Sequence, residues 1–181
     1  MNAPLNLSAD DFTLFGLSRA YTIDAVELDA RWRDLQARVH PDRFAAQGGA
    51  AQRVAMQWSV RVNEAYRRLK DPIARGAYLC ELQGVPIEAE RNTSMPTSFL
   101  MQQMQWREAL EEAGTADEVS ELDTRVRAES RAMQAQLAAL LDGRDGAAPD
   151  LHAAAQQVRA LMFVQRFLQD IARRADALDP L

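Results

Sequence analysis

Hydrophobic residues recur along the first half of the chain at intervals of three and four positions, which is the period of an amphipathic α-helix. One such stripe, in residues 25–39, consists of Leu28, Trp32, Leu35 and Val39. A second stripe, in residues 54–69, consists of Val54, Trp58, Val62, Ala65 and Leu69. Because about ten residues connect the two segments, the simplest packing is an antiparallel helical hairpin with the stripes facing each other.

Shorter apolar segments flank this hairpin at residues 11–17 and 72–82, and each predicts a short helix. Three longer helical patterns follow at about residues 97–113, 117–141 and 150–178. Their short connections favour an antiparallel three-helix bundle. The intervening sequence QGVPIEAERNTSMP combines glycine, two prolines and charges, which is typical of a linker.

The composition supports the same fold class. Only 8 glycines and 7 prolines occur among 181 residues, whereas Ala, Leu, Gln, Arg and Glu fill long segments, as they do in helical bundles. We therefore expect an all-α protein. Its predicted organisation is an N-terminal helical-hairpin domain at residues 1–83, a linker at 84–95 and a C-terminal three-helix bundle at 96–181.

Charge is distributed unevenly between these regions. Residues 1–83 contain 11 basic and 10 acidic side chains, a net charge of +1, and residues 84–181 contain 10 and 16, a net charge of -6. Such a step along the chain suggests two modules with different partners.

Several classes of protein are disfavoured by what the sequence lacks. The N-terminus has no basic segment before an apolar run, and no segment approaches the roughly 20 apolar residues that cross a bilayer, so we expect a cytoplasmic protein without a membrane partner. The single cysteine, Cys80, is expected to be a small buried apolar residue. It cannot supply a four-thiolate metal site, and the solvated position expected for His152 adds no ligand. The sequence predicts no metal and no cofactor.

The sequence RVHPDRFAAQGG, residues 38–49, forms a rigid polar corner between the two predicted helices. Pro41 disfavours helical backbone at His40, so the first helix should end there. Asp42, held in such a turn, could accept a charge-assisted hydrogen bond from an arginine of a partner protein. The plainer interpretation is that these residues only stop a helix and form a turn.

Catalysis and nucleic-acid binding explain this corner less well than protein recognition. No serine or cysteine lies nearby to act as a nucleophile with His40, so we expect no enzymatic activity. Arginines do occur on or just after the preceding helix, at Arg31, Arg33, Arg38 and Arg43. The whole chain nevertheless has a net charge of -5, which opposes binding to the phosphates of a duplex.

The tripeptide His40-Pro41-Asp42, the preceding RWRDLQARV and the later VNEAYRRLKDP together resemble the J-domain of co-chaperones that stimulate the ATPase of DnaK-type chaperones. The resemblance covers roughly residues 10–83. It implies that the corner and the basic face of the preceding helix bind the chaperone's ATPase domain. The implied contact residues are Arg33, Arg38, His40, Pro41, Asp42 and Arg43. Asn63 and Tyr66 are expected instead to support the hairpin internally.

Beyond residue 83 the chain differs from general J-proteins, because it has no glycine/phenylalanine-rich stretch and no repeated cysteine pair. The sequences FTLFGL, residues 12–17, and TSFLMQQMQWREALEE, residues 97–112, resemble the HscB family of J-proteins of iron–sulfur cluster assembly. This resemblance extends over nearly the whole length. It implies that the bundle carries the scaffold protein IscU to the chaperone HscA, whose ATPase the hairpin domain stimulates.

The helix predicted at residues 97–113 has two apolar sides. At about 100° per residue, Trp106, Leu110 and Ala113 return to within about 40° of Phe99 and form a core stripe. Another set lies about 100° to 200° from Phe99 and consists of Leu100, Met101, Met104 and Glu108. One helix of a three-helix bundle cannot easily bury both sides, so the leucine and methionines, bordered by Glu108 and Glu112, predict an exposed binding patch.

The last predicted helix adds a residue to this patch. Phe163 and Phe167 lie about 140° and 180° from Val158, away from the main apolar stripe. The resemblance to HscB implies a scaffold-binding set of Leu100, Met101, Met104, Gln105, Glu108, Glu112 and Phe163. Gln105 departs from the family pattern, in which a glutamate is usual at that point.

Three alternatives stay open at this level. The patch could pack on the N-terminal domain across the linker. The bundle could bind a different client or mediate oligomerisation. A helical nucleic-acid binder is the more remote possibility.

Overall fold

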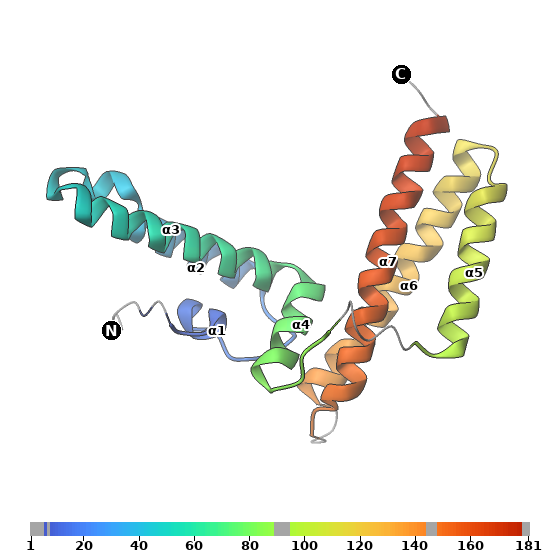
Figure 1. Ribbon diagram of the computed structural model, residues 1–181, viewed down its shortest axis with the longest axis horizontal. Coiled ribbons are helices and arrows are strands. Elements are labelled where there is room, and N and C mark those ends of the chain that lie inside the picture. Colours follow the sequence, from blue (N-terminus) through green and yellow to red (C-terminus); the bar gives the residue numbers. More distant parts are fainter. Residues whose placement is uncertain (1–5, 7, 89–94, 144–147, 179–181) are drawn as a thin grey trace. The chain divides into compact units, whose positions relative to one another are not determined.

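The computed structural model describes residues 6, 8–88, 95–143 and 148–178. All regular elements within these ranges are helices, which confirms the predicted all-α fold class. The chain divides into two compact units, Met1–Leu79 and Cys80–Leu181 (Figure 1). Among the described helices, none is both long and apolar enough to cross a membrane.

The boundary between the units falls within α4 (Pro72–Leu82). Of the predicted linker, residues 89–94 lie outside the described residues. Ile87 belongs to the second unit, where it is buried and its carbonyl accepts a hydrogen bond from Arg159 Nη1 at 3.0 Å. The predicted domain limits at residues 83 and 96 stay predictions.

The first unit begins with the short helix α1 (Asp11–Phe15), which is fixed at both ends by local chemistry. The Asp10 carboxylate accepts a hydrogen bond from the backbone N–H of Thr13 at 3.1 Å and caps the first turn. Gly16 ends the helix at φ 64°, a left-handed conformation that glycine adopts without strain. The helix thereby buries Phe12 and Phe15 in the core of this unit.

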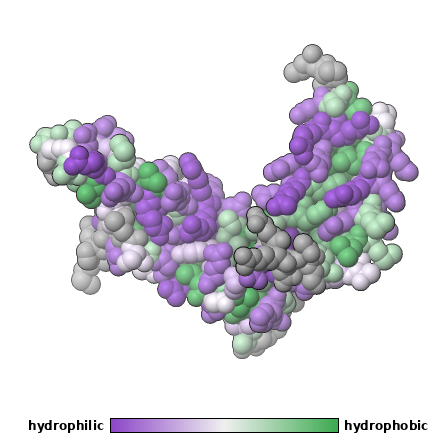
Figure 2. Space-filling model, viewed as in Figure 1, coloured by the Kyte–Doolittle hydropathy of each residue, from purple (hydrophilic) through white to green (hydrophobic). Residues whose placement is uncertain are grey.

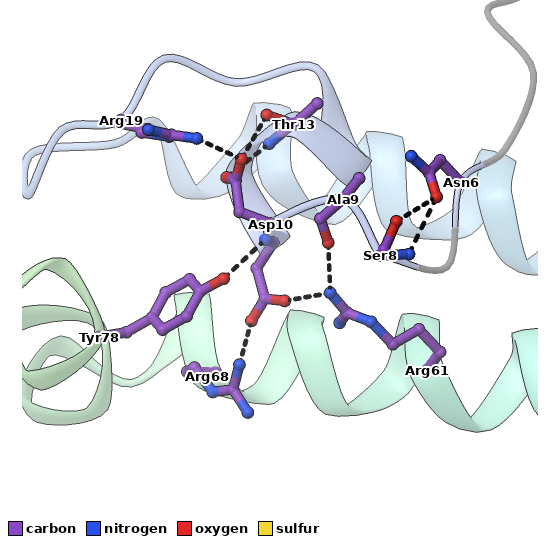
Figure 3. A network of polar contacts seen from close by, with 10 residues as sticks. Asn6, Ser8, Ala9, Asp10, Thr13, Arg19, Arg61, Arg68 and Tyr78 are labelled. Atoms are coloured by element: carbon purple, nitrogen blue, oxygen red, sulfur yellow. Dashed lines mark hydrogen bonds and ion pairs between the residues drawn. The ribbon is translucent and has the colours of Figure 1, made fainter. Parts of the chain in front are cut away.

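Asp10 also binds Arg19, whose Nη2 lies 2.8 Å from the carboxylate (Figure 3). Partial burial acts to raise the pKa of Asp10, but hydrogen bonds from Arg19 and Thr13 outweigh it and lower the pKa from 3.8 to about 2. Because the pKa is lower in the folded state, this carboxylate stabilises the fold fully above about pH 4. Its contribution is lost as the pH falls through about 2.

We expect Asp10→Asn to lower the free energy of unfolding at neutral pH by about 1 to 2 kcal/mol, because it removes the negative charge that pairs with Arg19 and with the N-terminus of α1, although asparagine can still cap the helix. The value is modest because the Arg19 side chain is 60% exposed and its charge is screened by water. Denaturant unfolding at neutral pH and near pH 2 measures the effect. The variant should lose less stability than the wild type between these two conditions, and an equal loss would contradict the assignment.

The hairpin consists of α2 (Ala25–Val39) and α3 (Gly49–Lys70), which pack along their length (Figure 1). Asp24 caps α2 by accepting hydrogen bonds from the N–H groups of Val26 and Glu27. The buried residues of α2 and α3 are Leu28, Leu35, Val39, Ala55, Val62, Ala65 and Leu69. The segment predicted as a loop is largely a 3-10 helix, η1 (Pro41–Gln47), and α3 starts five residues before Val54.

Val54 was predicted to face the core, and this prediction was wrong. Its side chain is 51% exposed, and the neighbouring Ala55 is buried instead. Eight residues separate Val54 from Val62, and at 100° per residue this places them about 80° apart around the helix. Ala55, seven residues before Val62, lies within about 20° of it and so takes the inward position.

Polar and aromatic contacts also join α2 to α3. Trp32 stacks on Tyr66 with ring centroids 4.6 Å apart, and its Nε1 donates to Asn63 Oδ1 at 3.0 Å. Tyr66 and Lys70 donate to Asp29, and these hydrogen bonds, with the charge of Lys70 and of Arg33, lower the pKa of Asp29. Asn63 and Tyr66 therefore hold the two helices together, which is the supporting role expected of them.

Cys80 lies near the end of α4 with 0% exposure. Burial, with a smaller effect from the charge of Glu81, raises the pKa of its thiol to about 11. The prediction of a buried cysteine is confirmed, and the thiol stays protonated and unreactive near neutral pH.

The second unit is a bundle of α5 (Thr97–Glu112), α6 (Ala116–Asp142) and α7 (Leu151–Leu178), which pack pairwise against one another (Figure 1). Thr115 and Glu118 form a capping box at the start of α6. The largest fully buried side chains of α6 and α7 are Val119, Leu122, Val126, Leu137, Val158, Leu161, Val164 and Ile171. His152, near the start of α7, is exposed as predicted.

Phe167 was predicted to fall away from the core stripe of the last helix, but it is only 3% exposed. Its ring stacks on Trp106 of α5 with centroids 5.8 Å apart. The helix α7 contacts both α5 and α6, so it buries two sides, and a single-stripe analysis identifies only one of them.

Candidate protein-interaction surfaces

The polar corner predicted at residues 40–42 lies at the junction of α2 and η1. The helix α2 ends at Val39, and His40 has extended backbone with φ -60° and ψ 128°, as expected for a residue before proline. Pro41 is the first residue of η1, where the absence of an N–H group costs no hydrogen bond. The helix stop at His40 is therefore as the sequence predicts.

Asp42 presents its carboxylate to solvent, since its side chain is 87% exposed. The hydrogen bond that shapes the turn uses its backbone instead, because Asp42 N–H donates to His40 Nδ1 at 3.3 Å. His40 itself is 55% exposed. The carboxylate is thus not folded back into the molecule and is available to a positively charged group of another protein.

The three arginines of the predicted contact set lie in different environments. Arg43 folds back so that its Nη1 donates to the Ala37 carbonyl at 3.0 Å, in the last turn of α2. Arg38 lies 3.8 Å from Asp34, one turn earlier on α2. Arg33 is exposed, and its offset of five positions from Arg38 places the two about 140° apart around the helix. A flat surface of a partner protein could therefore not contact all three arginines equally well.

Arg31, which was not included in the contact set, has an internal role. It donates to the Phe15 carbonyl at 3.0 Å and pairs with Glu27, so it fastens α1 to α2. Within the described ranges no cluster of three His, Cys, Asp or Glu side chains is arranged to hold a metal ion.

The apolar patch of α5 is exposed. Leu100, Met101 and Met104 are 44%, 59% and 62% exposed, whereas Phe99 and Trp106 on the opposite side are each 9% exposed. Gln105, Glu108 and Glu112 are also exposed and border these residues with polar and negative groups. On the visible face of the bundle, Figure 2 shows hydrophobic residues interspersed among hydrophilic ones. The two-sided character predicted for this helix is present.

Phe163, the α7 member of the predicted patch, is only half-buried. Its ring meets Phe99 edge-on with centroids 5.9 Å apart and stacks on Phe167 at 6.4 Å. The guanidinium of Arg107 lies 5.7 Å from the Phe163 centroid, in a cation–π contact. The sequence interpretation did not include Arg107, although at about 80° from Phe99 it lies on the same side of α5 as Leu100.

Known proteins are similar to this chain in sequence. Residues 95–172 match a family described as the HSCB C-terminal oligomerisation domain. A co-chaperone protein HscB homolog from Bordetella petrii is 51% identical over 168 residues, which cover 92% of this chain and 96% of that protein. A homolog of the same description from Burkholderia thailandensis is 47% identical over 179 residues, covering 97% of this chain and 99% of that protein.

Solved structures agree with the fold. The chaperone HscB from Vibrio cholerae superposes with a TM-score of 0.79 at 35% identity, over 94% of this chain and 100% of that one. Human co-chaperone protein HscB gives a TM-score of 0.84 at 26% identity, over 95% and 83% of the respective chains. A J-domain hairpin followed by a helical bundle is the architecture of a specialised co-chaperone. The chain belongs to the HscB family of co-chaperone proteins.

Proposed function

We propose that this protein stimulates the ATPase of a DnaK-type chaperone, HscA, and delivers the iron–sulfur cluster scaffold protein IscU to it. The exposed Asp42 carboxylate at the rigid corner is the observation that carries the first half of this proposal. The chaperone contacts lie at the corner and on α2, and they comprise Arg33, Arg38, His40, Pro41, Asp42 and Arg43. The protein acts as a cytoplasmic adaptor, without enzymatic activity or a cofactor of its own.

The exposed patch on α5 supports the second half. The patch combines adaptable apolar side chains with an acidic border, a pattern that suits a protein-binding surface. We assign the scaffold contact to Leu100, Met101, Met104, Gln105, Glu108, Glu112 and Phe163. An adaptor that binds both partners raises the concentration of the scaffold near the chaperone, so that delivery and ATP hydrolysis are coupled.

The decisive experiment measures steady-state ATP hydrolysis by HscA with this protein alone, with IscU alone and with both. Stimulation by the protein alone, increased further when IscU is added, is the expected result. If IscU has no additional effect, the bundle serves another client. If the protein alone gives no stimulation, the proposed function is wrong.

For the patch, we expect the double variant Leu100→Ala, Met104→Ala to weaken IscU binding about 10- to 100-fold, because it removes two exposed apolar anchors at the centre of the surface. Isothermal titration calorimetry measures the affinity. ATPase stimulation without IscU should persist. Met56→Ala is the matched control, since this methionine of α3 is 58% exposed but lies in the other unit. Loss of both activities in the double variant would contradict a dedicated scaffold surface.

Self-association of the bundle is a second candidate function for the same patch. It is favoured by the description of the matching family as an oligomerisation domain and by the exposure of Leu100, Met101 and Met104. Sedimentation velocity distinguishes the two. Scaffold binding predicts the same molar mass for the wild type and the double variant, whereas self-association predicts a lower mass for the variant.

A further inference from the structure

The two ring nitrogens of His40 have different surroundings, and one of them is already used within the protein. Nδ1 lies 3.3 Å from the backbone nitrogen of Asp42. A backbone N–H group can only donate, so Nδ1 must be the unprotonated acceptor nitrogen of a neutral ring. The ring proton is then on Nε2.

The position of this hydrogen bond explains why a cap is needed there. The first N–H groups of a helix have no partner inside the helix. Pro41 has no N–H, so Asp42 contributes the first donor of η1 that requires an acceptor. The carbonyl of His40 accepts from Arg43 N–H at 3.1 Å, so His40 satisfies two successive donors of this turn. Histidine thereby acts where Ser, Thr, Asp or Asn more commonly cap a helix.

The hydrogen bond between the Asp42 N–H and His40 Nδ1 also determines how the Asp42 carboxylate is presented. Its Oδ2 lies 3.5 Å from Nδ1, and in a neutral ring protonated at Nε2 neither of these atoms carries a proton, so the two do not hydrogen-bond. The Asp42 backbone is therefore held while its carboxylate remains 87% exposed. Arg43 adds a second side-chain bond to this turn by donating to the Ala37 carbonyl.

We propose that His40 is a positioning residue. Its neutral, Nε2-protonated ring caps η1 at Asp42 and so aims the Asp42 carboxylate at the chaperone. The role rests on the proposed ATPase stimulation, and it gives the imidazole an internal function in addition to its place in the chaperone contact set. The important hydrogen bond of the imidazole is the internal one to the Asp42 N–H. The important intermolecular bond is made by the Asp42 carboxylate.

Substitution of His40 by asparagine or by glutamine separates these roles, because each side-chain amide can replace only one of the two ring nitrogens. In His40→Asn the side-chain oxygen can occupy the place of Nδ1, and asparagine is a strong capping residue. In His40→Gln the amide reaches the place of Nε2 and the cap is lost. ATPase stimulation by His40→Asn should exceed stimulation by His40→Gln at least about fivefold, the effect typical of a lost cap.

A spectroscopic measurement that needs no chaperone tests the cap itself. Two-bond proton–nitrogen correlation spectra of the full chain, with nitrogen-15 in the histidines, show which ring nitrogen carries the proton. His152, exposed on α7, is the internal reference. We expect the Nε2-protonated form for His40 near neutral pH and lower protection of the Asp42 amide against hydrogen exchange in His40→Gln than in His40→Asn.

The outcomes are distinct. A proton on Nδ1 of His40, equal activity of the two variants, or greater loss in His40→Asn would each overturn the positioning role. If the wild-type protein fails to stimulate the chaperone, the proposed function is overturned, and the aiming role with it. The spectra then still report whether the internal cap exists.

Discussion

Asp42→Asn should reduce stimulation of the DnaK-type ATPase by about 10- to 100-fold, which corresponds to the loss of one charge-assisted hydrogen bond to a partner's arginine. The substitution keeps the size and shape of the side chain. It removes only the negative charge, from a group that is 87% exposed. The bond that shapes the turn uses the Asp42 backbone, which the variant retains.

The melting temperature is the necessary companion measurement. Exposed substitutions away from structural contacts change stability by no more than about 0.5 kcal/mol, so Asp42→Asn should unfold like the wild type. Glu64→Gln, which neutralises an exposed acid on α3, is the matched control and should keep full stimulation. If Asp42→Asn lost stability together with stimulation, the corner would be only a turn.

The second large effect concerns a carboxylate that the sequence interpretation did not single out. Asp11 has 0% exposure, yet it carries a charge. Arg61 and Arg68 of α3 lie 2.6 Å and 2.8 Å from its two oxygens, and its backbone N–H donates to the Tyr78 hydroxyl at 3.0 Å (Figure 3). The side chains around Asp11 therefore connect α1, α3 and α4.

We expect Asp11→Asn to lower the free energy of unfolding by about 2 to 3 kcal/mol. Removing one partner of a buried ion pair leaves uncompensated charge, which typically costs about 3 to 5 kcal/mol. The lower figure applies here because the Arg61 and Arg68 side chains are 22% and 43% exposed and can be partly hydrated. Equilibrium denaturation with urea measures the change.

Asp34→Asn supplies the comparison. Asp34 is 72% exposed and lies 3.8 Å from Arg38, so its loss should change stability by less than about 0.5 kcal/mol. Adding Arg68→Met to Asp11→Asn should recover part of the stability, because one unpaired charge is removed. Equal stability of Asp11→Asn and Asp34→Asn would show that the buried pair contributes nothing.

Much of the architecture could be predicted because it depends on local rules. Helical period, a proline after His40 and short connections between segments are all present in the sequence, and they lead to a hairpin and a bundle. Phe167 was misassigned because burial depends on which neighbours a helix meets, and α7 meets two, whereas Val54 was misassigned although helical angles alone favour Ala55. The 3-10 helix η1 replaces an expected loop because side-chain and backbone bonds of His40 and Arg43 order it.

The candidate surfaces also contain features that local sequence predicts and features that depend on contacts between distant residues. Exposure of Asp42 and of the Leu100 and Met104 side chains follows from turn chemistry and helical angles, so the sequence could predict it. The cation–π contact of Arg107 with Phe163 joins residues 56 positions apart on different helices, and no local pattern predicts that pairing. The same holds for the Asp11 ion pairs, since Arg61 and Arg68 are distant in sequence.

Because the Cys80 thiol is buried, the protein is suited to site-selective attachment of fluorophores. Because this thiol is protonated near neutral pH and shielded from reagents, a cysteine introduced at an exposed position would react far faster with a maleimide dye. A donor dye on α3 and an acceptor dye on α6 could then report by energy transfer how far apart the two units stay in solution, without first deleting the native cysteine.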